Sequence, residues 1–242
     1  KGNTVVATYK VSQADNVVFE EDVDPILPGV FSVSATKKVN FTKSNLYRDG
    51  SDFRFETKPT DCPTTWDANH VGHFYWTKTA AASYAVSYSD GTTAGTDVFW
   101  CGESNKLVVG GTSGLYALTE TEWSYLLNTR ANASDLKKRG VTVDDVANCL
   151  IIAPDDYGIA LKTSYTLAEL NAAGLVCLPP TGNRGSSGVN FSTTTGQYFT
   201  ASPYGADAKR LYFSNTSGPT FDSANRNWGL ALRLVKTVEE LI

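Results

Sequence analysis

The stretch from Asn227 to Lys236 constrains the fold of this chain more than any other, because it alternates with a period of two. Large apolar side chains occupy one face of the alternation: Trp228, Leu230, Leu232 and Leu234. The opposite face carries Ala231, Arg233 and Val235. This pattern predicts a β-strand with one well-buried face. We therefore expect the strand to lie in a sheet whose core is built by the residues before it.

The composition indicates a β-rich globular protein. Of 242 residues, 41% are hydrophobic, 12% aromatic and only 19% charged. The length fits one large domain, or one domain with a short appendage. We expect residues 1–28 to form an N-terminal extension or linker, because the acidic stretch 20–24 is followed by Pro25 and Pro28. Residues 29–242 would then form the domain.

Charge and hydropathy argue against two classes of partner. The net charge is −4, and the densest basic cluster is only Lys137-Lys138-Arg139. Binding of nucleic acid through phosphate contacts is therefore not expected. No apolar run approaches the roughly 18 residues that a transmembrane helix needs. The chain begins at Lys1 rather than Met, which suggests that it has been trimmed.

The four cysteines show neither C-x-x-C nor any metal-ligand spacing. Cys149 and Cys177 lie in apolar runs, so we expect packed thiols that act as small hydrophobes. Cys62 and Cys101 lie in turn-rich surroundings, where a disulfide between them is an alternative if the protein is exported.

Two helices are predicted from the same N-terminal pattern. Thr119 with Glu122, and Thr166 with Glu169, have the spacing of capping boxes. Gly174 follows the second helix, where a left-handed residue commonly ends one. Candidate strands surround these helices, at 31–41, 53–55, 175–178, 197–201 and 210–214. Residues 141–152 are expected to form a hairpin that turns at Asp144-Asp145 and leads into a buried strand. The order of strands and helices favours an α+β fold with two main helices over regular βαβ winding.

Two long irregular stretches, 61–115 and 181–206, are candidates for ligand-binding loops, because long loops in compact domains are usually functional. Aromatic side chains on such loops suit sugar faces or protein partners. The candidate ligand-binding residues are Tyr75, Trp76, Trp100 and Tyr204. Core packing is the plainer interpretation for each of them.

No catalytic residue or metal ligand stands out. His70 and His73 form H-x-x-H, but their segment is not convincingly helical, and hydrogen-bonding imidazoles are favoured. Asp155-Asp156 is interpreted as a turn. Asp222, Asn225 and Asn227 form an Asx-rich turn, with Ca²⁺ as a minority alternative and no other cofactor expected. Phosphate-loop, dinucleotide and G-x-S-x-G motifs do not occur.

Five segments in the same order give the chain a resemblance to a known family. Residues 118–130 match the pattern LT..EW.YLLN.R, and residues 172–184 resemble AGAVFLPA.G.R. Residues 31–46, 150–155 and 228–235 resemble its opening, its ILPD strand end and its closing GFSVRLV. These segments are similar to the major-paralogous domain of exported proteins from gut anaerobes. More distantly, they resemble the formylglycine-generating-enzyme (sulfatase-modifying factor) branch of the C-type-lectin-like fold.

The resemblance covers roughly residues 30 to 236 and implies a C-type-lectin-like α+β domain. Such a domain has two helices, small twisted antiparallel sheets and long irregular loops. The resemblance also implies export to the cell surface or beyond, often with a lipid anchor that would lie outside this chain. The catalytic relatives use a cysteine pair late in the domain, whereas the last cysteine here is Cys177. The iron-dependent relatives use several histidines, and this chain has two.

We therefore expect a non-catalytic, exported binding domain that recognises a glycan or a surface protein through the loops 61–115 and 181–206. Two alternatives remain at this point. One is an enzyme of the formylglycine-generating or another oxidoreductase branch. The other is a purely structural module of a cell-surface assembly.

Overall fold

The computed structural model describes residues 24–50, 52–65, 67, 69–76, 99–185 and 188–238. It corrects the expected fold class, because the chain is mostly β, with 43% strand and 10% helix. Among the described residues, only one helical segment reaches 10 residues, which contradicts an α+β fold with two main helices. Within the described residues, no helix is both long enough and apolar enough to cross a membrane.

The two predicted capping boxes are present, but each starts only a short helix. Thr119 caps α2 (Glu120–Ser124), which continues as the π-helical turn η3 (Tyr125–Thr129). Thr166 caps α3 (Leu167–Ala172), and Gly174 follows it with a φ of 63°. A capping box fixes where a helix begins, whereas the apolar stripe decides how far it extends. Here the stripe ends after one to three turns.

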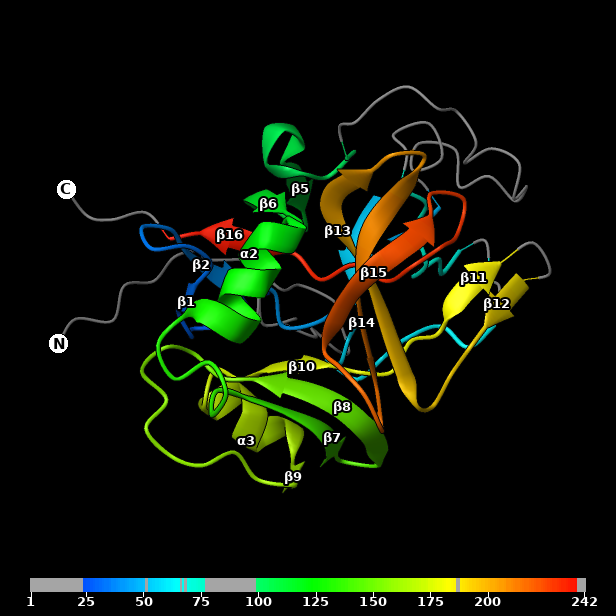
Figure 1. The fold of residues 1–242 in the computed structure, drawn as a ribbon. Helices are drawn as coiled ribbons and strands as arrows, with labels where there is room; N and C mark the ends of the chain where they lie inside the picture. The colour runs from blue at the N-terminus through cyan, green and yellow to red at the C-terminus, as the bar shows by residue number, and fades with distance from the viewer. Residues whose placement is uncertain are drawn as a thin grey trace, which may run out of the picture.

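Strands form three sheets and two separate hairpins (Figure 1). The largest sheet has the order β1-β2-β16-β6-β5. Its strands are β1 (Phe31–Ser32), β2 (Lys38–Phe41), β16 (Val235–Thr237), β6 (Thr112–Tyr116) and β5 (Leu107–Val109). The first and last described strands therefore belong to one sheet, with β16 between β2 and β6. The short 3₁₀ helix η2 (Glu103–Asn105) precedes β5.

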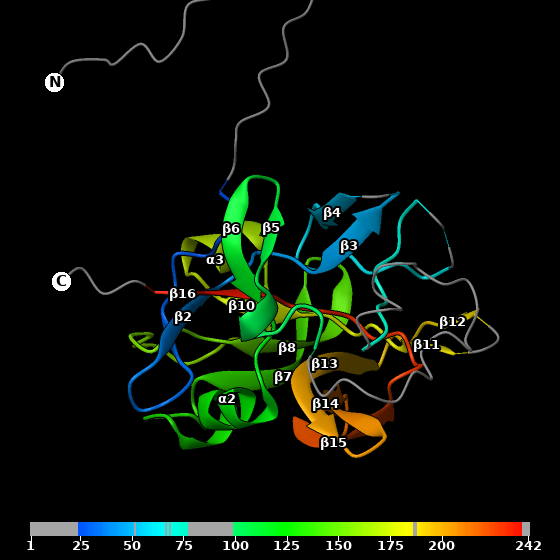
Figure 2. The same ribbon diagram turned by 90° about the horizontal axis from the view of Figure 1, so that it is seen from above.

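The second sheet has the order β10-β8-β7-β9 and confirms the predicted hairpin at 141–152. It contains β10 (Val176–Leu178), β8 (Val146–Ile152), β7 (Lys137–Val143) and β9 (Ser164–Tyr165). The third sheet contains β13 (Thr195–Tyr204), β14 (Asp207–Ser214) and β15 (Thr220–Asn225). The hairpins are β3 (Leu46–Asp49) with β4 (Asp52–Phe55), and β11 (Asn183–Gly185) with β12 (Gly188–Asn190). Figure 2 shows these parts from above.

The segment before β16 runs through the middle of the molecule. The predicted regular strand is present only from Val235 onward, and residues 229–231 join other segments through single β-bridges. Both faces of the segment are buried, because its alternation divides the side chains between two hydrophobic clusters. Leu230, Leu232 and Leu234 pack in one cluster, and Ala231 and Val235 pack in the other. The prediction of one buried face was therefore incomplete, because the second face is buried as well.

The described end of the N-terminal extension contacts the domain. Ile26 forms a bridge with Thr42, and the buried Leu27 donates its backbone N–H to the carbonyl of Phe41 at 2.8 Å. Residues 1–23 lie outside the described part of the chain, so the extension stays a prediction there. All four cysteines are free thiols, and the disulfide between Cys62 and Cys101 is not formed.

Candidate functional site

Three of the four aromatic residues predicted to bind a ligand lie in the interior. Tyr75, Trp76 and Trp100 are buried, whereas Tyr204 is 56% exposed. The indole N–H of Trp76 donates to the carbonyl of Thr200 at 2.8 Å, and that of Trp100 donates to the carbonyl of Tyr75 at 3.0 Å. These two buried indoles therefore join segments of the interior, which agrees with core packing rather than ligand binding.

Tyr204 is the candidate that the structure places at the surface. It ends β13, beside the turn residue Gly205, and the Lys209 ammonium lies 4.3 Å from its ring centroid. The described residues bring no second exposed aromatic ring next to it. Its role in binding stays a prediction.

A polar pocket follows β4, within and just before the first predicted binding loop. It has a volume of about 420 Å³. Its lining is Glu56, Thr57, Asp61, Cys62, Pro63, Thr64, Thr65, Asp67 and His70. The pocket therefore joins three carboxylates, an imidazole, a thiol and three hydroxyls, without any Lys or Arg.

Backbone pairing positions the two ends of this pocket. Glu56 follows β4, and its N–H donates to the carbonyl of Asn45 at 2.9 Å, while the Ser44 hydroxyl donates to its carbonyl. On the other side, Arg48 on β3 pairs with Val71 through backbone hydrogen bonds of 2.9 and 3.0 Å. This pairing brings His70 back over the hairpin, toward Glu56.

The floor of the pocket is a carboxylate covered by an imidazole. The Glu56 side chain is only 4% exposed, and His70 Nε2 lies 2.8 and 2.9 Å from its two oxygens. Burial raises the pKa of the Glu56 carboxyl, and the hydrogen bond from His70 offsets part of that rise. Tyr47 holds the imidazole from the other side, with its ring stacked at 4.1 Å between centroids. Glu56 and His70 are therefore fixed before any ligand arrives.

The neighbouring cysteine and histidine do not form a nucleophilic pair. Cys62 Sγ lies 3.9 Å from His73 Nε2, which is only 3.1 Å from the carbonyl of Thr181. A carbonyl can only accept, so Nε2 carries the proton and cannot take one from the thiol. Burial lowers the pKa of His73 to about 4 and raises the pKa of the Cys62 thiol above its ordinary value. The thiol is thus protonated, and the imidazole beside it is neutral.

The remaining carboxylates are engaged locally. Asp61 accepts from the Lys58 N–H at 3.0 Å, and Asp67 accepts from the Asn69 N–H at 2.9 Å, as turn-forming aspartates do. Within the described residues, no group of three or more His, Cys, Asp or Glu side chains is arranged to hold a metal ion.

The other acidic candidates are also occupied by protein groups. Asp222 pairs with Arg210 through two bonds of 2.6 and 3.0 Å, and Asn225 Oδ1 accepts from the Asn227 N–H. Asp155 is bound by Arg130 and Ser32, and although burial opposes it, these contacts lower the pKa of its carboxyl. Asp155 and Asp156 form a turn, as predicted, whereas Asp222 and Asn225 belong to the strand β15, so the turn predicted there is wrong except at residues 226–227.

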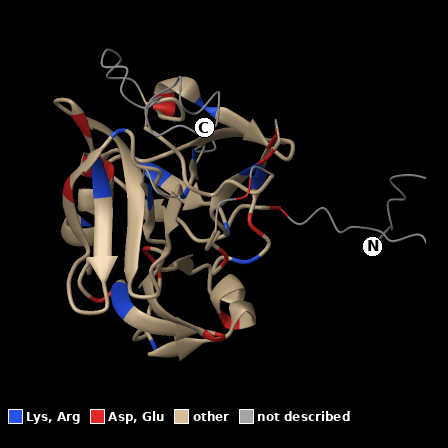
Figure 3. Cartoon of the chain, turned by 90° about the vertical axis from the view of Figure 1, so that its right-hand side faces the viewer, with Lys and Arg blue, Asp and Glu red and all other residues tan. Residues whose placement is uncertain are grey.

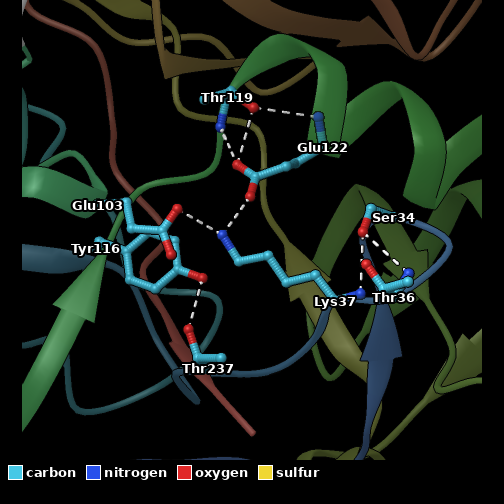
Figure 4. A network of polar contacts seen from close by, with 8 residues as sticks. All are labelled: Ser34, Thr36, Lys37, Glu103, Tyr116, Thr119, Glu122 and Thr237. Carbon is cyan, nitrogen blue, oxygen red and sulfur yellow. Dashed lines mark hydrogen bonds and ion pairs between the residues drawn. The ribbon is translucent and has the colours of Figure 1, made fainter.

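A separate cluster of charges joins five segments of the fold (Figure 4). Lys37 Nζ lies 2.7 Å from Glu103 and 2.6 Å from Glu122, the glutamate of the α2 capping box. Burial alone would lower the pKa of Lys37, but the hydrogen bonds to the two glutamates outweigh it and raise that pKa. Tyr116 packs against the ammonium and hydrogen-bonds Thr237 at 3.0 Å. Because one ammonium binds carboxylates from two different elements, this cluster holds the surrounding segments together.

Basic and acidic residues are interspersed over the side of the molecule seen in Figure 3. The pocket at Glu56 combines an open volume with polar groups whose pKa values are shifted, namely Glu56 and Cys62. Comparison of the chain with profiles of known protein families, with curated proteins and with solved structures finds no match.

Two residues of the pocket lining, Cys62 and His70, stood out in the sequence, whereas Glu56 did not. Glu56 follows the alternating Phe53 and Phe55 and has no local signal of burial. It is buried because residues 44–45, which lie before β3, bond to its backbone.

Proposed function

We propose that this protein is a non-catalytic binding domain of an exported protein, and that it recognises a glycan through the pocket formed by residues 56–70. The observation that carries the proposal is the buried Glu56 carboxylate, held by His70 on the floor of a polar pocket. Carboxylate and imidazole groups that are fixed in advance bind hydroxyl-rich ligands at low entropic cost.

The chemistry of the lining supports a glycan over an apolar ligand. The carboxylates of Glu56, Asp61 and Asp67 accept hydrogen bonds, and the threonine hydroxyls donate and accept. A sugar offers both kinds of partner at every hydroxyl. Export is supported by the sequence resemblance, and the protonated Cys62 beside a neutral His73 favours binding over catalysis.

A glycan array followed by calorimetry tests the proposal. We expect the full chain to bind at least one glycan class, and Glu56→Gln and His70→Ala each to weaken that binding roughly tenfold, since each removes a charge-assisted contact. Glu103→Gln is the matched control, because it changes a carboxylate that does not line the pocket and should leave affinity unchanged.

Two results would contradict the proposal. One is the absence of binding to every glycan on the array. The other is glycan binding that Glu56→Gln and His70→Ala leave unchanged, which would place the ligand elsewhere. If the array is negative but a purified surface protein binds, with the same sensitivity to these two variants, the pocket is a protein-binding site instead.

A further inference from the structure

A second surface feature lies at the edge of the four-stranded sheet. The edge strand β9 pairs with β7 at only two positions, Thr142 and Val143. Upstream of these, residues 136–138 border a groove of about 710 Å³. Its opposite wall is the segment 157–161. The groove therefore occupies the position that a longer β9 would fill.

The backbone at this edge is directed into the groove. Ala153 donates its N–H to the carbonyl of Leu136 at 2.8 Å, so these residues stand at a hydrogen-bonded position of the antiparallel ladder, although the N–H of Leu136 donates to the carbonyl of Asn132 at 3.1 Å instead of to Ala153. Such pairs alternate with pairs whose peptide groups point outward. Lys137, opposite Ile152, thus directs its N–H and carbonyl away from β8. Within the described residues, no hydrogen bond is formed by these two groups.

The same edge carries positive charge that no carboxylate neutralises. Lys137 Nζ donates to the carbonyl of Leu127 and lies 3.2 Å from Asn128 Oδ1. Lys138 Nζ donates to the carbonyl of Leu161 at 2.8 Å. In the described part of the chain, neither lysine nor Arg139 has a carboxylate oxygen within 4.0 Å. Asp135 also lines the groove, together with the two basic residues Lys137 and Lys138.

The far wall offers apolar surface. Ile159 is 65% exposed, and it is flanked in the groove lining by Tyr157 and Leu161. An extended strand alternates its side chains between two faces, so apolar side chains of a bound strand could contact Ile159 while its acids reach the lysines.

We propose that this groove binds an extended acidic peptide of a partner protein, which adds as a strand to the open edge of β7. Main-chain hydrogen bonds to Lys137 supply part of the affinity, as in other cases of strand addition. The charges of Lys138 and Arg139 select acidic sequences and speed association. This site is separate from the pocket at Glu56, and the proposal does not depend on the glycan.

Fluorescence anisotropy with a labelled synthetic peptide tests this assignment. The probe is a capped octapeptide of alternating Val and Glu between terminal Thr residues, and the controls are its Val–Lys counterpart and a version with Pro at the central position. We expect the full chain to bind the Val–Glu peptide with a Kd of roughly 10–100 μM, and more weakly as salt is added. The Val–Lys and Pro peptides should not bind.

Variants locate the site. Lys138→Gln/Arg139→Gln should weaken binding roughly tenfold, and Ile159→Asp should weaken it by a similar factor. The double variant Lys38→Gln/Lys58→Gln makes the same charge change on exposed lysines elsewhere and should bind like the wild type.

Three outcomes overturn the proposal. They are no saturable binding up to about 1 mM peptide, equal binding of the Val–Lys peptide, and affinity that the groove variants do not change. If the chain binds the probe only after residues 1–23 are removed, its own acidic segment fills the groove, and the assignment to a partner protein is wrong.

Discussion

Arg233 lies in the centre of the molecule, 2% exposed, and it is satisfied entirely by neutral groups. Its guanidinium donates to Asn45 Oδ1 at 2.9 Å and to four backbone carbonyls: Thr42, Lys43, Pro59 and Cys177. Burial lowers the pKa of Arg233, but a guanidinium stays charged over any ordinary pH range. Arg233 therefore links three segments to the terminal one: residues 42–45, the loop at Pro59, and β10.

Replacing Arg233 should be costly. We expect Arg233→Leu to lower the free energy of unfolding by at least about 3 kcal/mol, because five buried acceptors lose their donor. Arg233→Lys retains the charge, reaches fewer acceptors and should cost less. Arg54→Leu is the control, since its side chain is 55% exposed beside Asp49, and it should change stability by less than about 1 kcal/mol. Urea denaturation measures all three, and equal effects of Arg233→Leu and Arg54→Leu would refute the role of Arg233.

His73 should make the fold sensitive to acid. Its folded pKa, about 4, lies below its ordinary value, so the unfolded chain binds the proton first as the pH falls. The stability it contributes is complete above about pH 6.5 and is lost progressively as the pH falls toward 4, by about 3 kcal/mol in total. The free energy of unfolding should differ less between pH 7 and pH 4.5 in His73→Asn than in the wild type. A pH dependence that this variant leaves unchanged would assign the effect to other groups.

At the scale of secondary-structure elements, short local patterns were sufficient to predict where helices begin and where the chain turns. The caps at Thr119 and Thr166, the Asp144 turn, with a φ of 47°, and the buried strand β10 all follow from a few adjacent residues. β5 and β6 were missed, because Leu107–Val109 is short and Gly114 interrupts β6. β6 pairs with β16, more than 110 residues later in the chain, and no local pattern shows that.

The α2 cap provides a prediction at this scale. Thr119→Ala removes the acceptor for the Glu122 N–H, 3.2 Å away, and frees the glutamate that also holds Lys37. We expect a loss of about 1 kcal/mol in unfolding free energy. Thr121→Ala, at an exposed position in the same first turn, should be neutral or slightly stabilising because alanine favours helices. Thermal melts of both variants provide the comparison, and equal melting temperatures would contradict the capping role.

At the scale of the whole molecule, the sequence predicted that the segment 228–235 is essential. It did not predict where in the fold the segment lies. Its apolar alternation indicated burial, whereas its position between two hydrophobic clusters depends on side chains from nearly every sheet. The pocket at Glu56 depends on the same long-range assembly, since residues 44–45 and 71 hold it together. Sequence patterns of period two cannot distinguish one buried face from two.

Truncation tests the central segment. A chain that ends at Asn227 should fail to fold, because each cluster loses the buried residues that the segment contributes to it. It should bind hydrophobic dyes and lack near-ultraviolet dichroism. A chain that ends at Val238 retains all described residues. Its melting temperature should lie within a few degrees of that of the full chain, as for a substitution that does not change stability. A folded, cooperative Asn227 truncation would show that the segment is dispensable.

The insertion of β16 between β2 and β6 has a consequence for how the protein is made. The five-stranded sheet cannot close until residues 235–237 have been synthesised, so the four strands that precede β16 in the chain must wait for it. Pairings so distant along the chain also form slowly. Refolding should therefore be limited by the arrival of β16 between β2 and β6.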